Sequence, residues 1–235
     1  MKNPRKLKSI DLHSNALPIE CEPTRNEKHF LWISHTVVNL YNRQLTKLGG
    51  VPAMAPHLRI FIREGQDQLE FGDPITRIDL GIFETAYSGI DATALKCHGY
   101  ERNMRMLDWL QNILIVLAKL RDWDEMLLNQ TYRGCVDEHL EFILESKPKL
   151  SPDRRFKTVF KISFDDVDTV IQLKVFTRSG IEIATQESRD RSAIMVPWVM
   201  RELLTSANWQ KIDARGQPWN FTSGFLGWHF SVEVG

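Results

Sequence analysis

Four cysteine and histidine side chains are the best candidates for a metal site. Cys97 and His98 are adjacent, and Cys135 and His139 lie four residues apart in a segment predicted to be helical. Residues four apart on a helix point to one side, and zinc accepts both thiolate and imidazole ligands. However, an adjacent pair lacks the spacing typical of structural zinc sites, and Cys135 and His139 share an apolar stripe. The sequence therefore favours buried packing here, and we predict neither a bound metal nor a cofactor.

A second set of residues resembles the core of metal-dependent nucleases, in which an acidic residue precedes Gln-x-Lys on a strand. The candidates are Asp153, Asp165, Asp166, Gln172 and Lys174. In such a core, carboxylates bind Mg²⁺ and the lysine stabilises the attacked phosphate or water. The same glutamine and lysine also occupy the positions that face solvent on a strand with one buried face. A Mg²⁺-dependent nuclease is therefore the alternative function.

The strong signatures of catalysis are absent from the sequence. There is no phosphate-binding glycine loop, dinucleotide fingerprint, nucleophile elbow, Cys-x-x-Cys pair or His-Glu-x-x-His helix. The seven histidines also lack a local signature of a Ser-His-Asp or Cys-His site. Because many active sites are built from dispersed residues, this leaves the enzymatic question open but favours a non-catalytic role.

Two surface features could instead bind a partner. Four acidic residues lie within a short stretch near the end of the third predicted helix: Asp137, Glu138, Glu141 and Glu145. Complementary charge would select a basic protein partner, although such a flank is also typical of a solvated helix face. Aromatic residues gather near the C-terminus, and Trp219 and Trp228 are the candidates for contact with a partner. Alternation along strands equally predicts that such rings face the core.

The composition limits the classes of partner and the cellular setting. Thirty basic residues balance thirty acidic ones, so no overall field attracts nucleic acid or an anionic membrane. The longest apolar run covers residues 113–118, far less than the roughly 20 residues of a spanning helix. The three cysteines are widely spaced, and no secretion signal precedes them. We therefore expect a cytoplasmic protein that does not enter a membrane and is unlikely to bind nucleic acid.

Hydrophobic periodicity predicts a mixed fold. Helical spacing is found over residues 27–48, 100–120, 122–145 and 191–204. Alternation predicts a hairpin of 57–62 with 68–71, a strand at 75–83, a meander of 156–164, 169–177 and 181–185, and strands within 209–234. The predicted class is α+β, with antiparallel sheet and about four amphipathic helices packed on one face. We expect a single domain over residues 1–235, with an internal boundary near 147–152 as the alternative.

These observations lead to one functional hypothesis and one rival. Modest size, neutral charge and the lack of a catalytic motif favour a non-enzymatic, cytoplasmic protein-binding protein. An inhibitor or immunity-type protein that masks a basic partner is the form that the acidic helix suggests. The rival is the Mg²⁺-dependent nuclease with a degenerate Asp…Gln-x-Lys core. The sequence does not determine the oligomeric state.

Overall fold

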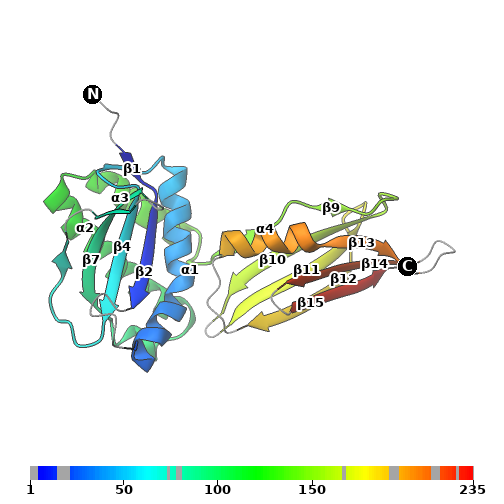
Figure 1. The fold of residues 1–235 in the computed structure, drawn as a ribbon, viewed down its shortest axis with the longest axis horizontal. Helices are drawn as coiled ribbons and strands as arrows, with labels where there is room; N and C mark the ends of the chain where they lie inside the picture. The colour runs from blue at the N-terminus through cyan, green and yellow to red at the C-terminus, as the bar shows by residue number, and fades with distance from the viewer. Residues whose placement is uncertain are drawn as a thin grey trace. The chain divides into compact units, whose positions relative to one another are not determined.

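The chain forms two compact units, Met1–Phe142 and Ile143–Gly235, in a computed structural model (Figure 1). The structure describes residues 5–14, 22–72, 75–77, 81–165, 168–190, 196–212, 218–225 and 228–234. The division between the units falls shortly before residues 147–152, the segment where the sequence suggested an internal boundary. No described helix is both long enough and apolar enough to cross a membrane.

Unit 1 is built on a mixed sheet with three helices. Its sheet strands are β2 (Ser9–Ser14), β4 (His57–Arg63), β5 (Glu70–Phe71), β6 (Ile75–Arg77) and β7 (Gly81–Gly89). The helices are α1 (Arg25–Lys47), α2 (Gly99–Arg121) and α3 (Glu125–Asp137). A short 3-10 turn, η1 (Ala94–Lys96), precedes α2. A separate pair joins β1 (Arg5–Leu7) to β3 (Val51–Ala53). The predicted helices at 27–48 and 100–120 are therefore confirmed.

The ends of α1 follow from its sequence. Thr24 accepts a hydrogen bond from the Glu27 backbone, and the Glu27 side chain accepts one from the Thr24 backbone, which forms a capping box. At the other end, Gly49 and Gly50 have positive φ angles of 87° and 74°. The Gly50 N–H donates to the Leu45 carbonyl, 2.9 Å away, and so satisfies a terminal carbonyl of the helix. The glycine pair therefore stops α1 and turns the chain toward β3.

Strand pairing in unit 1 differs from the predicted hairpin. β4 pairs in parallel with β2 on one side and with β7 on the other. β5 pairs antiparallel with β7, so the predicted pairing of 57–62 with 68–71 is wrong. The reason is the α1 crossover, which returns the chain so that β2 and β4 run in parallel and leaves β4 central. Alternating burial identifies a strand but does not name its neighbours.

The third helix is shorter than its predicted range of 122–145. α3 ends at Asp137, and His139 and Leu140 follow with positive φ angles of 54° and 56°. Leu140 N–H donates to the Cys135 carbonyl at 3.1 Å, and the Leu140 side chain is fully buried. Burial of this leucine therefore accompanies a turn that ends the helix. The prediction of a helix to Glu145 is wrong, because Glu145 lies on a strand of unit 2.

Unit 2 contains antiparallel strands and one helix (Figure 1). Its elements are β8 (Ile143–Glu145), β9 (Lys149–Leu150), β10 (Phe156–Phe164), β11 (Thr169–Thr177), β12 (Glu182–Asp190), α4 (Val196–Ser206), β13 (Asn208–Lys211), β14 (Trp219–Phe225) and β15 (Trp228–Val234). β10, β11 and β12 form the predicted meander, and β13, β14 and β15 form a second one. The antiparallel part of the predicted fold is thus confirmed in this unit.

The core of unit 2 lies between its strands and α4. Phe160 of β10 and Phe221 of β14 are fully buried, with ring centroids 6.2 Å apart. Leu203 of α4 is also fully buried, and its carbonyl accepts a hydrogen bond from the Ser223 hydroxyl at 3.1 Å. α4 therefore belongs to this unit, whereas α1, α2 and α3 belong to unit 1. The expectation of four helices on one face of a sheet is corrected accordingly.

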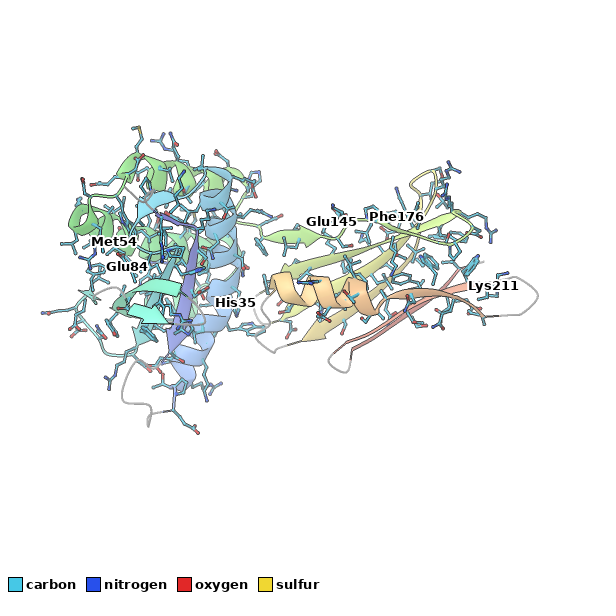
Figure 2. The ribbon with its side chains drawn as sticks, turned by 45° about the horizontal axis from the view of Figure 1, so that its top comes forward. His35, Met54, Glu84, Glu145, Phe176 and Lys211 are labelled. Atoms are coloured by element: carbon cyan, nitrogen blue, oxygen red, sulfur yellow. The ribbon has the colours of Figure 1, made fainter. Side chains whose placement is uncertain are left out.

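Glu84 is a buried carboxylate of unit 1 that belongs to no predicted site. Glu84 of β7, labelled in Figure 2, is 1% exposed, and among the described residues neither of its oxygens has a hydrogen-bond partner. Burial raises its pKa, and the nearby positive charge of Arg121, whose Nε is 3.6 Å away, acts in the opposite direction. Arg121 also donates to the Gly72 carbonyl at 3.2 Å. Arg121 thus joins the end of α2 to Glu84 of β7 and to the Gly72 carbonyl after β5, and this arrangement indicates a structural role for the Glu84–Arg121 pair.

Candidate functional site: an arginine hollow in unit 2

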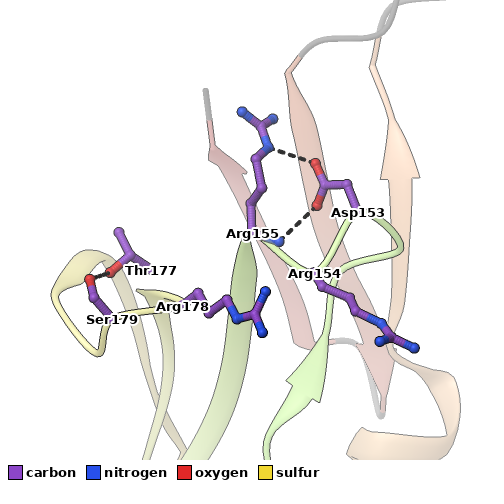
Figure 3. Close-up of a pocket in the computed structure, with 6 residues that line it drawn as sticks. All are labelled: Asp153, Arg154, Arg155, Thr177, Arg178 and Ser179. Atoms are coloured by element: carbon purple, nitrogen blue, oxygen red, sulfur yellow. Dashed lines mark hydrogen bonds and ion pairs between the residues drawn. The ribbon is translucent and has the colours of Figure 1, made fainter.

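An open hollow of about 550 Å³ lies at one end of unit 2 (Figure 3). It is formed by Asp153, Arg154, Arg155, Thr177, Arg178 and Ser179. Three of these residues are arginines and one is acidic, so the lining has an excess of positive charge. We refer to this feature as the arginine hollow.

Two neighbouring turns place these residues together. The first turn precedes β10, where the Arg154 N–H donates to the Ser151 carbonyl at 2.9 Å. The second turn joins β11 to β12, where the Gly180 N–H donates to the Thr177 carbonyl at 3.0 Å. The Arg178 N–H donates to the Arg155 carbonyl at 2.8 Å and ties the two turns together. The hollow is therefore positioned by the end of the β10–β11 ladder rather than by a free loop.

Asp153 organises one wall of the hollow. One of its oxygens accepts from the Ser151 hydroxyl at 2.7 Å and from the Arg155 N–H at 3.1 Å. The other accepts from Arg155 Nε at 2.7 Å and from Trp219 Nε1 at 2.8 Å. Burial alone would raise the pKa of Asp153, but these hydrogen bonds outweigh it and lower the pKa below its ordinary value. The negative charge of Asp153 is thus neutralised by Arg155, and its other hydrogen bonds go to Ser151 and Trp219 of the same unit.

Arg154 and Arg178 are different, because within the described residues neither guanidinium has a hydrogen bond or an ion pair. In Figure 3 the side chain of Arg178 extends toward the segment that contains Arg154 and Arg155, whereas the side chain of Arg154 extends from that segment in the direction away from Arg178. Arg178 lies opposite Arg155 at the end of the strand pair, where its N–H donates to the Arg155 carbonyl. Arg154 has a φ of 58°, a conformation that costs a residue with a side chain about 1 kcal/mol. Among the described residues, Arg154 and Arg178 are thus the two arginines of the hollow whose charge is not compensated.

The hydroxyl side of the hollow can supply a further donor. Thr177 Oγ1 accepts from the Ile181 N–H at 3.1 Å and lies 2.8 Å from Ser179 Oγ. Either hydroxyl can be the donor in this bond, and in one of the two arrangements Thr177 donates to Ser179. The Ser179 proton is then available to a ligand, because each hydroxyl has one proton to donate.

Unit 2 also has exposed aliphatic side chains, two of them next in sequence to the turns that form the hollow. Leu150 is 53% exposed, Ile181 65%, Ile183 44% and Ile212 49%. Leu150 and Ile181 belong to the two turn segments themselves. Ile212 follows Lys211, whose ammonium lies 5.6 Å from the centre of the Trp219 ring that contacts Asp153 (Figure 2). We call the arginine hollow together with these four side chains the hollow end of unit 2.

The acidic residues singled out in the sequence do not form one flank. Asp137 ends α3 and Glu141 lies in the following turn, both exposed, whereas Glu145 belongs to β8 of unit 2. Glu138 bonds to Arg43, and also accepts from Gln44 and Lys47 at 2.6 Å each. Burial alone would raise the pKa of Glu138, but the bonds from Lys47 and Gln44 and the charge of Arg43 lower it. Glu138 thus joins α3 to α1, and its charge is neutralised internally.

The two tryptophans predicted to contact a partner have separate outcomes. Trp219 is 8% exposed and uses its N–H for Asp153, so its ring packs within unit 2 and supports the hollow. Trp228 lies on β15, but its side chain is outside the described part of the structure. Trp219 therefore supports the hollow indirectly, through its hydrogen bond to Asp153.

The residues that resemble a nuclease core form pairs with neighbouring strands. Lys174 donates to Glu182 at 3.0 Å, and Gln172 donates to Glu187 at 2.8 Å. Asp165 pairs with Arg189, Asp166 lies outside the described residues, and Asp153 belongs to the hollow. Gln172 and Lys174 thus make the cross-strand pairs that are usual on the solvent side of a sheet.

This pairing leads to a prediction for Lys174→Ala. Because an exposed ion pair contributes at most about 1 kcal/mol, we expect a small loss of stability by chemical denaturation. We also expect wild type and variant to show the same background when incubated with single-stranded and duplex DNA in Mg²⁺. Cleavage by the wild type that disappears in Lys174→Ala would instead establish the nuclease alternative.

The four candidate zinc ligands lie on different parts of unit 1. Cys135 is fully buried on α3, and burial, followed by the charge of Glu138, raises the pKa of its thiol to about 12. Cys97 contacts Thr93 and Glu101, His98 precedes α2, and His139 is exposed beyond α3. Among the described residues, no group of three or more His, Cys, Asp or Glu side chains is arranged to bind a metal.

Sequence reasoning did not select the hollow, although its parts have recognisable signals. Ser151-Pro152-Asp153 and Ser179-Gly180 are turn sequences, and each has an arginine beside it. What the sequence does not contain is the ladder register that brings the turns together. Comparison with protein-family models, with curated proteins and with solved structures finds no match for this chain.

Proposed function

We propose that the chain is a non-catalytic protein-binding protein and that it binds its partner through the hollow end of unit 2. The observation that supports this most is the pair of arginines in the hollow, Arg154 and Arg178, which have no side-chain partner among the described residues, in a unit that also exposes aliphatic side chains. Arginine is enriched at protein interfaces, where it combines an apolar stem with five donors. Large exposed aliphatic side chains are candidates for contact with a partner where they gather on one surface.

The proposal changes the expected chemistry of the partner. The sequence suggested a basic partner, but Glu138 is neutralised by α1, and Glu145 does not share a helix with Asp137. The lining of the arginine hollow has an excess of positive charge, and unit 2 exposes aliphatic side chains, so the hollow end favours a partner with an acidic group and apolar neighbours. Masking such a surface would still give the protein the inhibitor-type or immunity-type role that we inferred from its composition.

The test uses affinity capture with the full chain and two matched double variants. Ile181→Glu with Ile212→Glu places charges on the hollow end, whereas Leu120→Glu with Met126→Glu changes two equally exposed residues of unit 1. We expect a stoichiometric protein partner with the wild type and with the unit 1 variant, and its loss with the hollow-end variant. Loss with the unit 1 variant alone would place the interface elsewhere and contradict the proposal.

A further inference from the structure

We propose that Glu84 is a proton-operated latch in unit 1. With a proton on its carboxylate, the end of α2 stays packed against β7, and loss of the proton loosens this junction. The inference goes beyond the interface proposed in unit 2 and does not depend on it. It also goes beyond the structural role of the Glu84–Arg121 pair, because it makes the strength of the junction depend on pH.

The closed structure compensates the charge of Glu84 only in part. Glu84 is 1% exposed, and among the described residues neither carboxylate oxygen accepts a hydrogen bond. The Nε atom of Arg121 lies 3.6 Å from Oε1 of Glu84, beyond hydrogen-bond distance, and has no acceptor within the described residues. A buried carboxylate without hydrogen bonds loses its hydration, and one cation at this separation restores only part of that free energy. The closed structure therefore favours the protonated form.

The titratable side chains of β4 and β5 lie on the face of the sheet opposite to Glu84. They belong to residues paired with odd-numbered positions of β7: His57, Arg59, Arg63 and Glu70. On its own face, Glu84 is paired with Leu58 of β4, which is fully buried. The side chains of β6 lie outside the described residues. Among the described groups, Arg121 of α2 is thus the one whose charge acts on Glu84, and burial outweighs this charge and raises the pKa of Glu84.

The end of α2 is the part of this junction that can open. Arg121 is the last residue of α2, and Asp122 follows it with a positive φ of 53°. The Arg121 side chain is 28% exposed and also donates to the Gly72 carbonyl at 3.2 Å. Helix ends open at a lower free energy than a packed core does. Movement of this turn lets water reach Glu84, and a hydrated carboxylate returns to its ordinary acidity.

Thermodynamic linkage sets the direction of the pH dependence. The carboxylate of Glu84 binds its proton more tightly in the closed state than in the open, hydrated state, so protons stabilise the closed state. As pH rises from the ordinary pKa through the pKa of the closed state, the open state gains population and then levels off. Each unit by which the closed-state pKa exceeds the ordinary one changes the opening equilibrium by up to about tenfold.

The first measurement is a ¹³C NMR titration of the Glu84 carboxyl carbon in the full-length chain. We expect a midpoint above the ordinary value of 4.5, with the same midpoint at Arg121 Nε and at the Gly72 N–H. Arg121→Gln removes the compensating charge and should move the Glu84 midpoint further upward. Glu70→Gln, at an exposed acid of β5, is the matched control and should leave the midpoint in place.

The second measurement is amide hydrogen exchange at residues 118–123 in wild type and Glu84→Gln. These amides have the same intrinsic exchange rates in both chains, so a difference at equal pH reports opening. Wild type should exchange faster above the Glu84 midpoint, and the two chains should converge well below it. A Glu84 midpoint at or below the ordinary value, or identical exchange of the two chains at every pH, would overturn the proposal. If Glu84→Gln does not fold, the titrations of wild type and Arg121→Gln decide it.

Discussion

Asp153→Ala is expected to lower the free energy of unfolding of unit 2 by about 2 kcal/mol. The carboxylate receives four hydrogen bonds, from Ser151, Trp219 and two groups of Arg155. Trp219 is 8% exposed and Ser151 is 2% exposed, so both donors would lose a charged acceptor in a largely dry setting. The value is kept modest because the carboxylate side chain itself is 30% exposed and water can replace part of it.

Two controls separate the charge from the shape. Asp153→Asn keeps one acceptor oxygen but turns an amide group toward the donors, so its cost should be similar to that of alanine. Glu233→Ala removes an exposed acid of β15 and should change little. Hydrogen exchange measured by mass spectrometry should show the loss of protection in residues 151–156 and 219–222. Uniform loss across both units would contradict a local role for Asp153.

The lowered pKa of Asp153 also predicts a pH dependence. Because the folded-state pKa lies below the unfolded value, the contribution of this group is fully present above the unfolded pKa of about 3.9 and is lost as pH falls through the folded value. The stability difference between wild type and Asp153→Ala should therefore be constant at neutral pH and shrink in acid. A difference that grows below pH 4 would show that the carboxylate is not the stabilising group.

The parts of the fold that were predictable depend on contacts within one segment. Period-two alternation placed β10 and β11 at the right residues, and Gly49 and Gly50 indicated the end of α1. These features are determined by neighbouring side chains and by the φ angles that only glycine adopts at low cost. These features can therefore be predicted from windows of about ten consecutive residues.

The site was less predictable because it depends on register and on partners distant in sequence. The acidic run in the sequence predicts that Glu138 belongs to a charged flank. In the structure, Arg43 and Lys47, more than ninety residues earlier, neutralise it. The sequence predicts Trp219 either at a partner contact or in the core. In the structure its N–H donates to Asp153, which lies 66 residues earlier in the chain. The arginine hollow joins two turns whose proximity depends on the pairing of Phe156 with Thr177 and on the backbone bond from Arg178 to Arg155. Local patterns do not contain these distances.

The largest effect in unit 1 is expected for Gly50→Ala, at about 3 kcal/mol. Two costs combine at this position. The φ angle of 74° is unfavourable for alanine by about 1 kcal/mol. A Cβ atom would also lie 2.4 Å from the Leu7 carbonyl oxygen, which is backbone and must move with β1. Displacement of packed backbone typically adds about 2 kcal/mol, so β1, β3 and the end of α1 should all loosen.

Gly65→Ala is the matched control for this prediction. Gly65 has nearly the same φ angle, 79°, but no atom lies within 4 Å of the Cβ that alanine would add. It therefore reports the backbone cost alone, and we expect about 1 kcal/mol in the same chemical denaturation experiment. Equal losses for the two variants would mean that β1 yields freely to the added atom. A larger loss for Gly50→Ala, with reduced amide protection at Leu7 and Val51, would establish that β1 and the end of α1 are packed as one element.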